Sequence, residues 1–218
     1  MTGAVAIDLR GQRMMLFAER AVFWEETRTL IVADAHLGKP SVLRAQGVPV
    51  PPGTAREDLG RLGRLLQQTR ADRILFLGDL FHGPLNPSDT GFCNRFVRWR
   101  NARPEVRLVL IAGNHDPAAA QIPTAFGIDA VATSLAEGPF WFTHRPGTGA
   151  PDYNLAGHVH PAVRLRGAGR WSETLPCFVF GAGGGLLPAF GSFTGNAVVR
   201  PTTDDRIYAI AADEVVPI

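Results

Sequence analysis

The stretch from Leu30 to His36, LIVADAH, joins a short apolar run to an aspartate and a histidine. The same pattern returns in ILFLGDLFH at residues 74–82 and in LVLIAGNHD at residues 108–116. Apolar runs of about four or five residues, rich in β-branched or aromatic types, are typical of strands buried on both faces. The sequence therefore predicts three buried strands, each ending in polar residues: Leu30–Ala33, Ile74–Leu77 and Leu108–Ala112.

Two amphipathic helices are expected between these strands. The first begins at Thr54, where Glu57 would complete a capping box, and it carries leucines along one face. The second follows Asn86-Pro87 and presents large aromatic residues at helical spacing. Strands that alternate with helices pair in parallel, so this half of the chain should form a βαβ arrangement.

The second half of the chain is rich in glycine and in short apolar runs, and it shows few helical patterns. Further strands are expected at Phe140–Thr143, Asn154–Ala156 and Cys177–Phe180. A length of 218 residues is ordinary for one domain, so we expect residues 1–218 to form a single unit. We predict an α/β fold, a four-layer α/β/β/α sandwich in which two packed mixed sheets are flanked by helices.

The composition excludes several classes of protein. The chain is 45% hydrophobic and 19% charged, which excludes bulk disorder. A net charge of +2 leaves no polybasic tail for nucleic acid or membrane lipid. The long uncharged run at 174–199 contains several glycines and two prolines, so we expect no membrane span there. A cytoplasmic location is the default expectation.

Polar side chains follow five of the predicted strands. Ligands of an open α/β sheet bind beyond the carboxyl ends of its strands, so these side chains should meet at one edge. All six histidines fall in these segments, which favours a metal site over six separate structural roles. The segments contribute Asp34, His36, Asp79, His82, Asn114, His115, Asp116, His144, His158 and His160.

The types of these residues indicate the metal and its chemistry. Carboxylate, amide and imidazole groups without a thiolate suit Mn, Fe, Zn or Ni, and the oxygen ligands favour Mn²⁺. The candidates are too many for one ion, whereas two ions that share a carboxylate would use them, and two-metal sites serve in-line displacement at phosphorus. The alternation in Asp34-x-His36 and in His158-x-His160 would turn each pair the same way if these segments are extended.

The motifs DAH (34–36), GDLFH (78–82), GNHD (113–116) and GHVH (157–160), with a lone His144 before the last, resemble those of the calcineurin-like metallophosphoesterase superfamily. The resemblance implies one divalent metal ion held by Asp34, His36, Asp79 and His160, and a second held by Asp79, Asn114, His144 and His158. It also implies in-line attack by a hydroxide that bridges the ions. His115 would contact the phosphate and protonate the leaving oxygen, and Asp116 would orient His115.

A narrower resemblance rests on VADAHLGK at 32–39, GDLFHG at 78–83 and LLPAFGSFTG at 186–195. Over roughly residues 5–205, the chain is similar to the bacterial ligase-associated DNA damage response endonuclease family. The resemblance implies a DNA endonuclease with a functional link to a DNA ligase repair system. Ala35 and Asn196 depart from the pattern, but neither is at a ligand position. A chain too short for a further DNA-gripping domain should prefer flexible single strands over stiff duplex.

Several residues near the motifs are candidate substrate contacts, and each has a plainer alternative. His82, Lys39 and Arg145 could meet phosphate oxygens, but a packing histidine and solvated loop residues are equally open readings. Arg164 and Arg166 could guide a nucleic-acid backbone toward the metals, or they could form a solvated strand face.

The core motifs leave the substrate open among DNA, a small phosphodiester, a cyclic nucleotide and a phosphomonoester. Only the narrower resemblance favours DNA. A binding module that has lost catalysis should show replaced ligands, and here every expected ligand position is filled. The oligomeric state is open.

Overall fold

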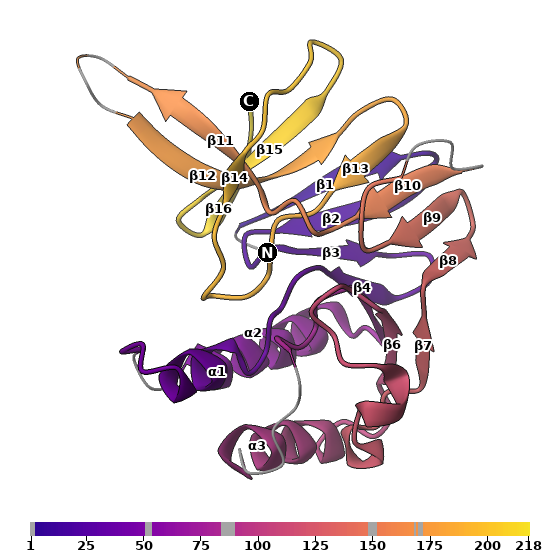
Figure 1. Ribbon diagram of the computed structural model, residues 1–218. Coiled ribbons are helices and arrows are strands. Elements are labelled where there is room, and N and C mark those ends of the chain that lie inside the picture. Colours follow the sequence, from indigo (N-terminus) through magenta and orange to yellow (C-terminus); the bar gives the residue numbers. More distant parts are fainter. Residues whose placement is uncertain (1–2, 51–53, 84–89, 148–151, 168, 170–171) are drawn as a thin grey trace.

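The computed structural model describes residues 3–50, 54–83, 90–147, 152–167, 169 and 172–218. Its strands form two sheets, and its α-helices lie together on the side of the first sheet (Figure 1). The helices are α1 (Lys39–Ala45), α2 (Thr54–Thr69) and α3 (Thr90–Asn101), with two short 3-10 helices at Ala119–Gln121 and Thr124–Phe126. No helix among the described residues combines the length and the apolar character needed to cross a membrane.

The first sheet contains the three strands that the opening motifs predict. Its seven strands lie side by side in chain order: β1 (Ala4–Leu9), β2 (Gln12–Phe17), β3 (Ala21–Trp24), β4 (Thr29–Val32), β5 (Arg73–Leu77), β6 (Arg107–Ile111) and β7 (Ala130–Ala132). β1 to β4 pair antiparallel, whereas β4 to β7 pair in parallel. The parallel pairing expected for β4, β5 and β6 is therefore confirmed.

The second sheet is also mixed. Its main path runs β14-β11-β12-β13-β10-β9-β8, and β15 pairs with β12 and β16. The bounds are β8 (Ser134–Glu137), β9 (Phe140–Thr143), β10 (Tyr153–Ala156), β11 (Pro161–Arg166), β12 (Ser172–Phe180), β13 (Gly184–Leu186), β14 (Ala197–Val198), β15 (Arg206–Ala211) and β16 (Glu214–Pro217). β9 and β10, which carry the later histidine motifs at their ends, pair in parallel.

An apolar layer fills the space between the two sheets. Trp24 of the first sheet meets Phe140 of the second edge-on, with ring centroids 5.1 Å apart. Leu75 and Leu77 of β5 and Phe178 of β12 are buried in the same layer. Burial of large apolar side chains from both sheets stabilises their face-to-face packing.

The helices cover the opposite face of the first sheet. Leu62 and Leu65 of α2 and Phe96 of α3 are fully buried there, in one cluster with Phe76 of β5. Helix α2 begins at Thr54 as predicted, although the side chain that would form the capping box lies outside the described part. The expected helix start at Asn86-Pro87 also lies outside the described residues, and α3 runs from Thr90.

The α/β class and the two packed mixed sheets agree with the prediction. One layer differs: across the described ranges, α1 to α3 all belong to the first sheet, and none covers the second. The outward face of the second sheet instead carries a small apolar cluster that includes Leu175, Cys177 and Val179 of β12. Helix α1 was not anticipated from the sequence, although Pro40 in its first turn is a recognised start signal.

Candidate metal centre

The polar motifs gather where strand ends of the two sheets meet. Asp34 and His36 follow β4, Asp79 follows β5, and Asn114 follows β6 in the first sheet. His144 follows β9, and the GHVH motif at 157–160 follows β10 in the second sheet. The centre is therefore built from the carboxyl ends of five strands, as predicted from the strand-end pattern.

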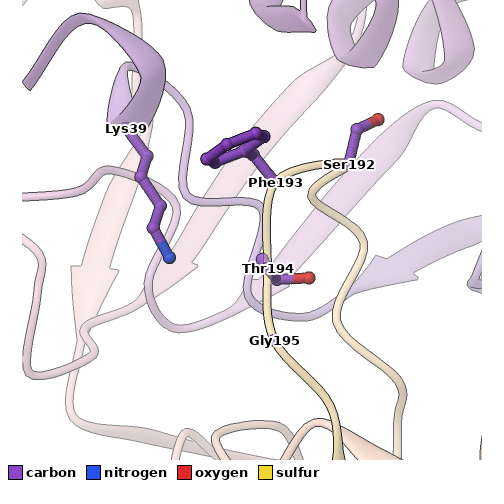
Figure 2. Close-up of a pocket in the computed structure, with 5 residues that line it drawn as sticks. All are labelled: Lys39, Ser192, Phe193, Thr194 and Gly195. Atoms are coloured by element: carbon purple, nitrogen blue, oxygen red, sulfur yellow. The ribbon is translucent and has the colours of Figure 1, made fainter. Parts of the chain in front are cut away.

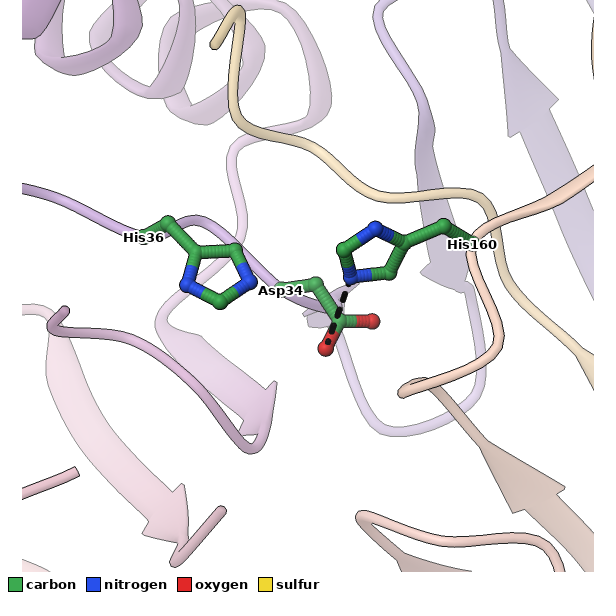
Figure 3. Close-up of side chains that lie close together, drawn as sticks. All are labelled: Asp34, His36 and His160. Atoms are coloured by element: carbon green, nitrogen blue, oxygen red, sulfur yellow. Dashed lines mark ion pairs between the residues drawn. The ribbon is translucent and has the colours of Figure 1, made fainter. Parts of the chain in front are cut away.

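One group of potential ligands consists of Asp34, His36 and His160, whose ligand atoms all lie within 4.8 Å of one another. Nε2 of His160 lies 3.5 Å from Oδ1 of Asp34, the contact drawn as a dashed line in Figure 3. The two imidazole rings approach Asp34 from opposite sides in the same view. A carboxylate between two imidazoles is a suitable donor set for a divalent transition metal.

A second group consists of Asp79, His144 and His158. Nδ1 of His158 lies 3.1 Å from Nε2 of His144, a separation compatible with two nitrogens that bind one ion at about 2.1 Å each. Oδ1 of Asn114 lies 3.1 Å from the same Nε2, so the amide oxygen faces the same space.

One carboxylate oxygen faces both groups. Oδ2 of Asp79 lies 3.7 Å from Nε2 of His36 in the first group and 3.6 Å from Nε2 of His144 in the second. The Asp79 side chain is 3% exposed. Asp79 therefore stands at the position that a bridging carboxylate would need between two ions.

Hydrogen bonds determine which ring nitrogen of His144 and of His160 is available to bind a metal. Nδ1 of His144 lies 3.1 Å from the carbonyl oxygen of Leu77, and Nδ1 of His160 lies 3.0 Å from that of Gly195. A carbonyl accepts only, so each Nδ1 carries the proton and each Nε2 keeps a lone pair for a metal.

Asp34 shows directly that the centre suits a cation. Its side chain is fully buried, and Oδ2 accepts a 2.7 Å hydrogen bond from the backbone N–H of His158. Oδ1 is buried with no hydrogen-bond partner. A buried carboxylate oxygen that accepts no hydrogen bond is costly unless a cation satisfies it, and Nε2 of His160, 3.5 Å away, is itself a metal-ligating nitrogen, so the residues present fit a bound metal.

Burial keeps one of the histidines in the neutral form that a metal needs. The pKa of His36 is lowered to about 3, mainly by burial. The neighbouring His160 and His82 lower it further. The His36 imidazole is therefore neutral near pH 7. Burial also lowers the pKa of His82.

The backbone at the ligand positions is not extended. Residues with positive φ are uncommon outside glycine, yet five candidate ligands have φ between 44° and 67°. They are Asp34, His36, Asp79, His158 and His160. The condition under which Asp34-x-His36 and His158-x-His160 would each turn the same way, an extended segment, is therefore not met, because the chain turns sharply after each strand. Strain of this kind clusters at functional sites.

Glycines beside the ligands leave the space that the ligands occupy. A Cβ added to Gly157 would lie 2.5 Å from Oδ2 of Asp34. A Cβ on Gly78 would overlap the His144 ring, and one on Gly113 would overlap Asp79. These contacts show why the motifs GDLFH, GNHD and GHVH each begin with a glycine.

His115 lies at the open side of the centre. Its ring is exposed, stacks on His82 at 4.8 Å between centroids, and meets His36 edge-on at 5.3 Å. The His115 backbone N–H donates a 2.8 Å hydrogen bond to Oδ1 of Asp79. His82 is partly buried, and its Nδ1 lies 3.1 Å from Nδ1 of His36.

Asp116 makes contacts other than the expected one. Its two oxygens accept 2.8 Å hydrogen bonds from the backbone N–H groups of Phe81 and Gly113. The bond from Phe81 ties the loop after β5 to the loop after β6, and the bond from Gly113 lies within the loop after β6. Burial raises the pKa of Asp116, although the backbone donors oppose that shift.

The predicted substrate contacts divide into two groups. Arg145 is exposed at the edge of the centre and donates a 3.1 Å hydrogen bond to Oδ1 of Asn114. Lys39 is half-buried at the start of α1, two residues beyond Leu37 and close to the His36 ligand position. Arg164 and Arg166 are exposed on β11, outside both ligand groups.

Residues 190–195 also border the centre, which sequence reasoning did not predict. The N–H of Phe190 donates to the carbonyl of Ala33 at 2.8 Å, and that of Gly191 to the carbonyl of Asp34 at 3.2 Å. With Lys39, the segment lines a cavity of about 400 Å³ (Figure 2). The sequence signal for this segment is LLPAFGSFTG, a point of family resemblance to which the residues themselves assign no role.

Comparison with known proteins agrees with this geometry. A family model described as calcineurin-like phosphoesterase matches residues 27–158. No curated protein matches the chain significantly.

Among solved structures, the chain is similar to the Pseudomonas putida nuclease MPE, with 34% identity and a TM-score of 0.83 over 99% of this chain and 100% of the other. It is less similar to a protein of unknown function from Aquifex aeolicus, with 17% identity, a TM-score of 0.43, and coverage of 61% and 78%. Yfce, a phosphoesterase from E. coli, has 18% identity and a TM-score of 0.41 over 85% and 88% of the two chains.

Proposed function

This chain belongs to the calcineurin-like phosphoesterase family, and from that premise we propose that it is a two-metal phosphodiesterase that cleaves DNA. The observation that carries the proposal is the position of Asp79, whose Oδ2 faces a histidine of each ligand group at 3.7 Å and 3.6 Å. A shared carboxylate is what distinguishes a two-metal centre from two unrelated sites.

The proposed ligand sets follow the two groups. One metal is held by Asp34, His36, Asp79 and His160, and the other by Asp79, Asn114, His144 and His158. The mixture of oxygen and imidazole donors supports Mn²⁺ as the native ion. When bound, two such ions activate a nucleophile and neutralise charge on a phosphoryl group.

The protein's own residues hold the substrate and move a proton. His115 is exposed beside the centre, and its backbone is fixed by Asp79, so its ring is in reach of a phosphate that binds there. We assign it the protonation of the leaving oxygen. Asp116 acts on His115 through the loop that it holds, since its oxygens bind Phe81 and Gly113. Arg145, beside Asn114, is placed to contact a phosphate oxygen.

The whole-length similarity to a nuclease supports DNA as the substrate. Single strands are the preferred form in this proposal, because a flexible strand can bend its phosphate toward a recessed centre. Arg164 and Arg166 would guide that strand from β11. The reaction belongs in this proposal to DNA repair, with a functional link to a DNA ligase.

The test uses Mn²⁺-loaded protein, with Asp79→Ala as the inactive control. Substrates are closed circular single-stranded DNA, a duplex of the same sequence, and a small phosphodiester such as bis-p-nitrophenyl phosphate. We expect the circle to be cut well ahead of the duplex. Hydrolysis of the small diester with no cutting of either DNA would overturn the nuclease assignment, and faster cutting of the duplex would overturn the strand preference.

A further inference from the structure

The segment from Phe190 to Gly195 is held rigidly against the metal centre at both ends. At one end, the N–H groups of Phe190 and Gly191 donate to the carbonyl oxygens of Ala33 and Asp34. At the other end, the carbonyl of Gly195 lies 3.0 Å from Nδ1 of His160. The segment therefore cannot move independently of two proposed ligands.

Side-chain contacts support the middle of the same segment. The N–H of Ser192 donates to Oδ1 of Asp58 at 3.2 Å, and its hydroxyl donates to the same oxygen at 2.5 Å. The hydroxyl of Thr194 donates to the carbonyl of Gly191 at 2.9 Å. Asp58 is buried in α2, so the tip of the segment is fastened to the helix layer.

Phe193 stands at this tip with its ring partly in solvent. Its side chain is the one aromatic among the large exposed apolar side chains of the described residues, and it is 38% exposed. Exposed apolar side chains are common singly, but this one lines a cavity of about 400 Å³ beside a catalytic centre. Figure 2 shows the Phe193 ring on the side of the segment that faces Lys39.

Lys39 forms the opposite wall of that cavity. It is the protein's single lysine and extends from the start of α1, and in Figure 2 its ammonium group lies on the same side of the segment as the Phe193 ring. The cavity thus offers an aromatic face and one positive charge. A flat apolar group linked to a phosphate fits this pair, and a nucleotide unit of a single strand is such a group.

We propose that Phe193 and Lys39 form a nucleotide subsite in which one base of a single-stranded DNA substrate stacks on Phe193 while an adjacent phosphate contacts Lys39. The subsite rests on the proposed nuclease function and extends it, because it names how the strand is gripped next to the cut bond. A base inside a duplex is already stacked on its neighbours, so the subsite also gives a physical reason for the preference for single strands. It assigns a role to the segment LLPAFGSFTG.

The test is an abasic scan of a short single-stranded oligonucleotide. One tetrahydrofuran abasic unit replaces each nucleotide in turn, and KM is measured with Mn²⁺-loaded protein. In the wild type, the abasic unit at one position should raise KM about tenfold relative to the intact strand, the loss typical of one base–aromatic stack. In Phe193→Ala, the intact strand should show that same raised KM, and the abasic position should have no further effect. Phe193→Trp should restore the wild-type pattern.

Two further variants separate stacking from charge and from general damage. Lys39→Gln should raise KM for every strand of the scan alike and should reduce the log–log salt slope by about 0.7, the value for one phosphate contact of a single strand. Ile218→Ala, which also truncates an exposed apolar side chain but lies outside the cavity, should match the wild type.

The outcomes distinguish the subsite from the nuclease function. A Phe193→Ala protein that cleaves the intact strand with wild-type KM and keeps the abasic effect overturns the subsite and leaves the nuclease assignment standing. A wild-type protein that cleaves no intact strand but hydrolyses a small diester overturns the nuclease assignment, and the subsite with it.

Discussion

Gly157→Ala tests whether the exact position of Asp34 controls the metal centre. Gly157 begins the GHVH motif, and its φ is not in the left-handed region, so alanine is compatible with its backbone. The added Cβ, however, would lie 2.5 Å from Oδ2 of Asp34 and 2.8 Å from Cβ of Ala33. The change is therefore purely steric and is directed at one proposed ligand.

The size of the effect follows from the displacement. The distance from the added Cβ to Oδ2 of Asp34 must grow by about 0.5 Å to reach 3.0 Å, the shortest distance that real Cβ contacts show. It must grow by about 0.9 Å to reach an ordinary contact of 3.4 Å. Asp34 is fully buried, and the added Cβ would also lie 3.0 Å from the carbonyl oxygen of Leu77, so the methyl group cannot turn away from Asp34 without meeting other buried atoms. A misplacement near 1 Å can cost about 10²-fold in rate. Overpacking of this kind costs about 1–3 kcal/mol of stability, which lowers Tm by roughly 2–12 °C at this chain length.

The assay measures Mn²⁺ affinity by calorimetry, phosphodiester hydrolysis and Tm of the metal-free protein. Gly157→Ala should bind Mn²⁺ about 10- to 100-fold more weakly, the range for groups that position metal ligands. Gly183→Ala is the matched control, because its Cβ would meet no atom within 4 Å and its φ is also ordinary. If the two variants bind Mn²⁺ with the same affinity, the ligand geometry does not depend on the space at Gly157.

The other predictions concern roles of single groups. Asp79→Ala should lose metal occupancy and activity together, whereas His115→Ala should lose rate but keep both ions; equal metal loss in elemental analysis would contradict this separation. His115→Ala should slow DNA cleavage by about 10²–10⁴-fold and barely affect a nitrophenyl diester, whose leaving group needs no proton; equal slowing would indicate positioning instead. Joint replacement of Arg164 and Arg166 by alanine should weaken DNA cleavage and spare the small diester, and the wild-type log–log salt slope should be roughly −2 for about three phosphate contacts; a slope of zero would exclude a charged grip. In metal-free protein, His36 binds a proton in the unfolded but not in the folded state between pH 6.5 and about 3, so its stabilising contribution is present above pH 6.5 and is lost as the pH falls. In that window His36 should contribute a fall of about 1.4 kcal/mol per pH unit to the free energy of unfolding measured by urea titration, and His36→Asn should reduce the slope by that amount.

The strands around the motifs could be predicted because burial on both faces leaves a strong local signal. β4, β5 and β6 begin and end within a residue of the apolar runs that predicted them. Strand β1 alternates polar and apolar residues in part, and the apolar runs MMLF of β2 and AVFW of β3 are not followed by Asp or His, so no chemical motif marks them. The turn between β1 and β2 is formed by Arg10 and Gly11 with φ of 56° and 76°. Two positive φ values usually call for Asn-Gly or Asp-Gly, so Arg10 hides this hairpin from sequence reasoning.

That no helix covers the described second sheet could not be predicted from the sequence, for a different reason. A sandwich with helices on both sides is a common solution for two packed sheets, and the glycine-rich second half offered no contrary pattern. In the structure, Cys177 and Val179 face outward in a cluster with Ile207, so strands β12 and β15 supply part of their own cover. That arrangement depends on sheet curvature and pairing across 30 residues, which local patterns do not report.

The identity of the candidate ligands was accessible because histidine and aspartate at strand ends are few and chemically distinctive. Their backbone geometry was not, since the spacing of Asp34 and His36 is the same in an extended segment and in the turn that they form, with φ of 51° and 44°. Positive φ at residues other than glycine costs free energy, and only the surrounding tertiary contacts select it. Residues such as Phe193 lie about 150 positions beyond Lys39 in the chain, and no periodicity links them.

The metal centre also depends on contacts between the two sheets, which explains why it could not be built from either half of the sequence. Asp34, from the first sheet, accepts its backbone hydrogen bond from His158, which follows the second. His144, from the second sheet, lies 3.1 Å from the carbonyl of Leu77 in the first. The same bonds therefore align the two sheets and orient the ligands. A shift of one sheet relative to the other would separate the ligand groups, so the apolar layer around Trp24 and Phe140 sets the ligand geometry as well as the stability of the fold.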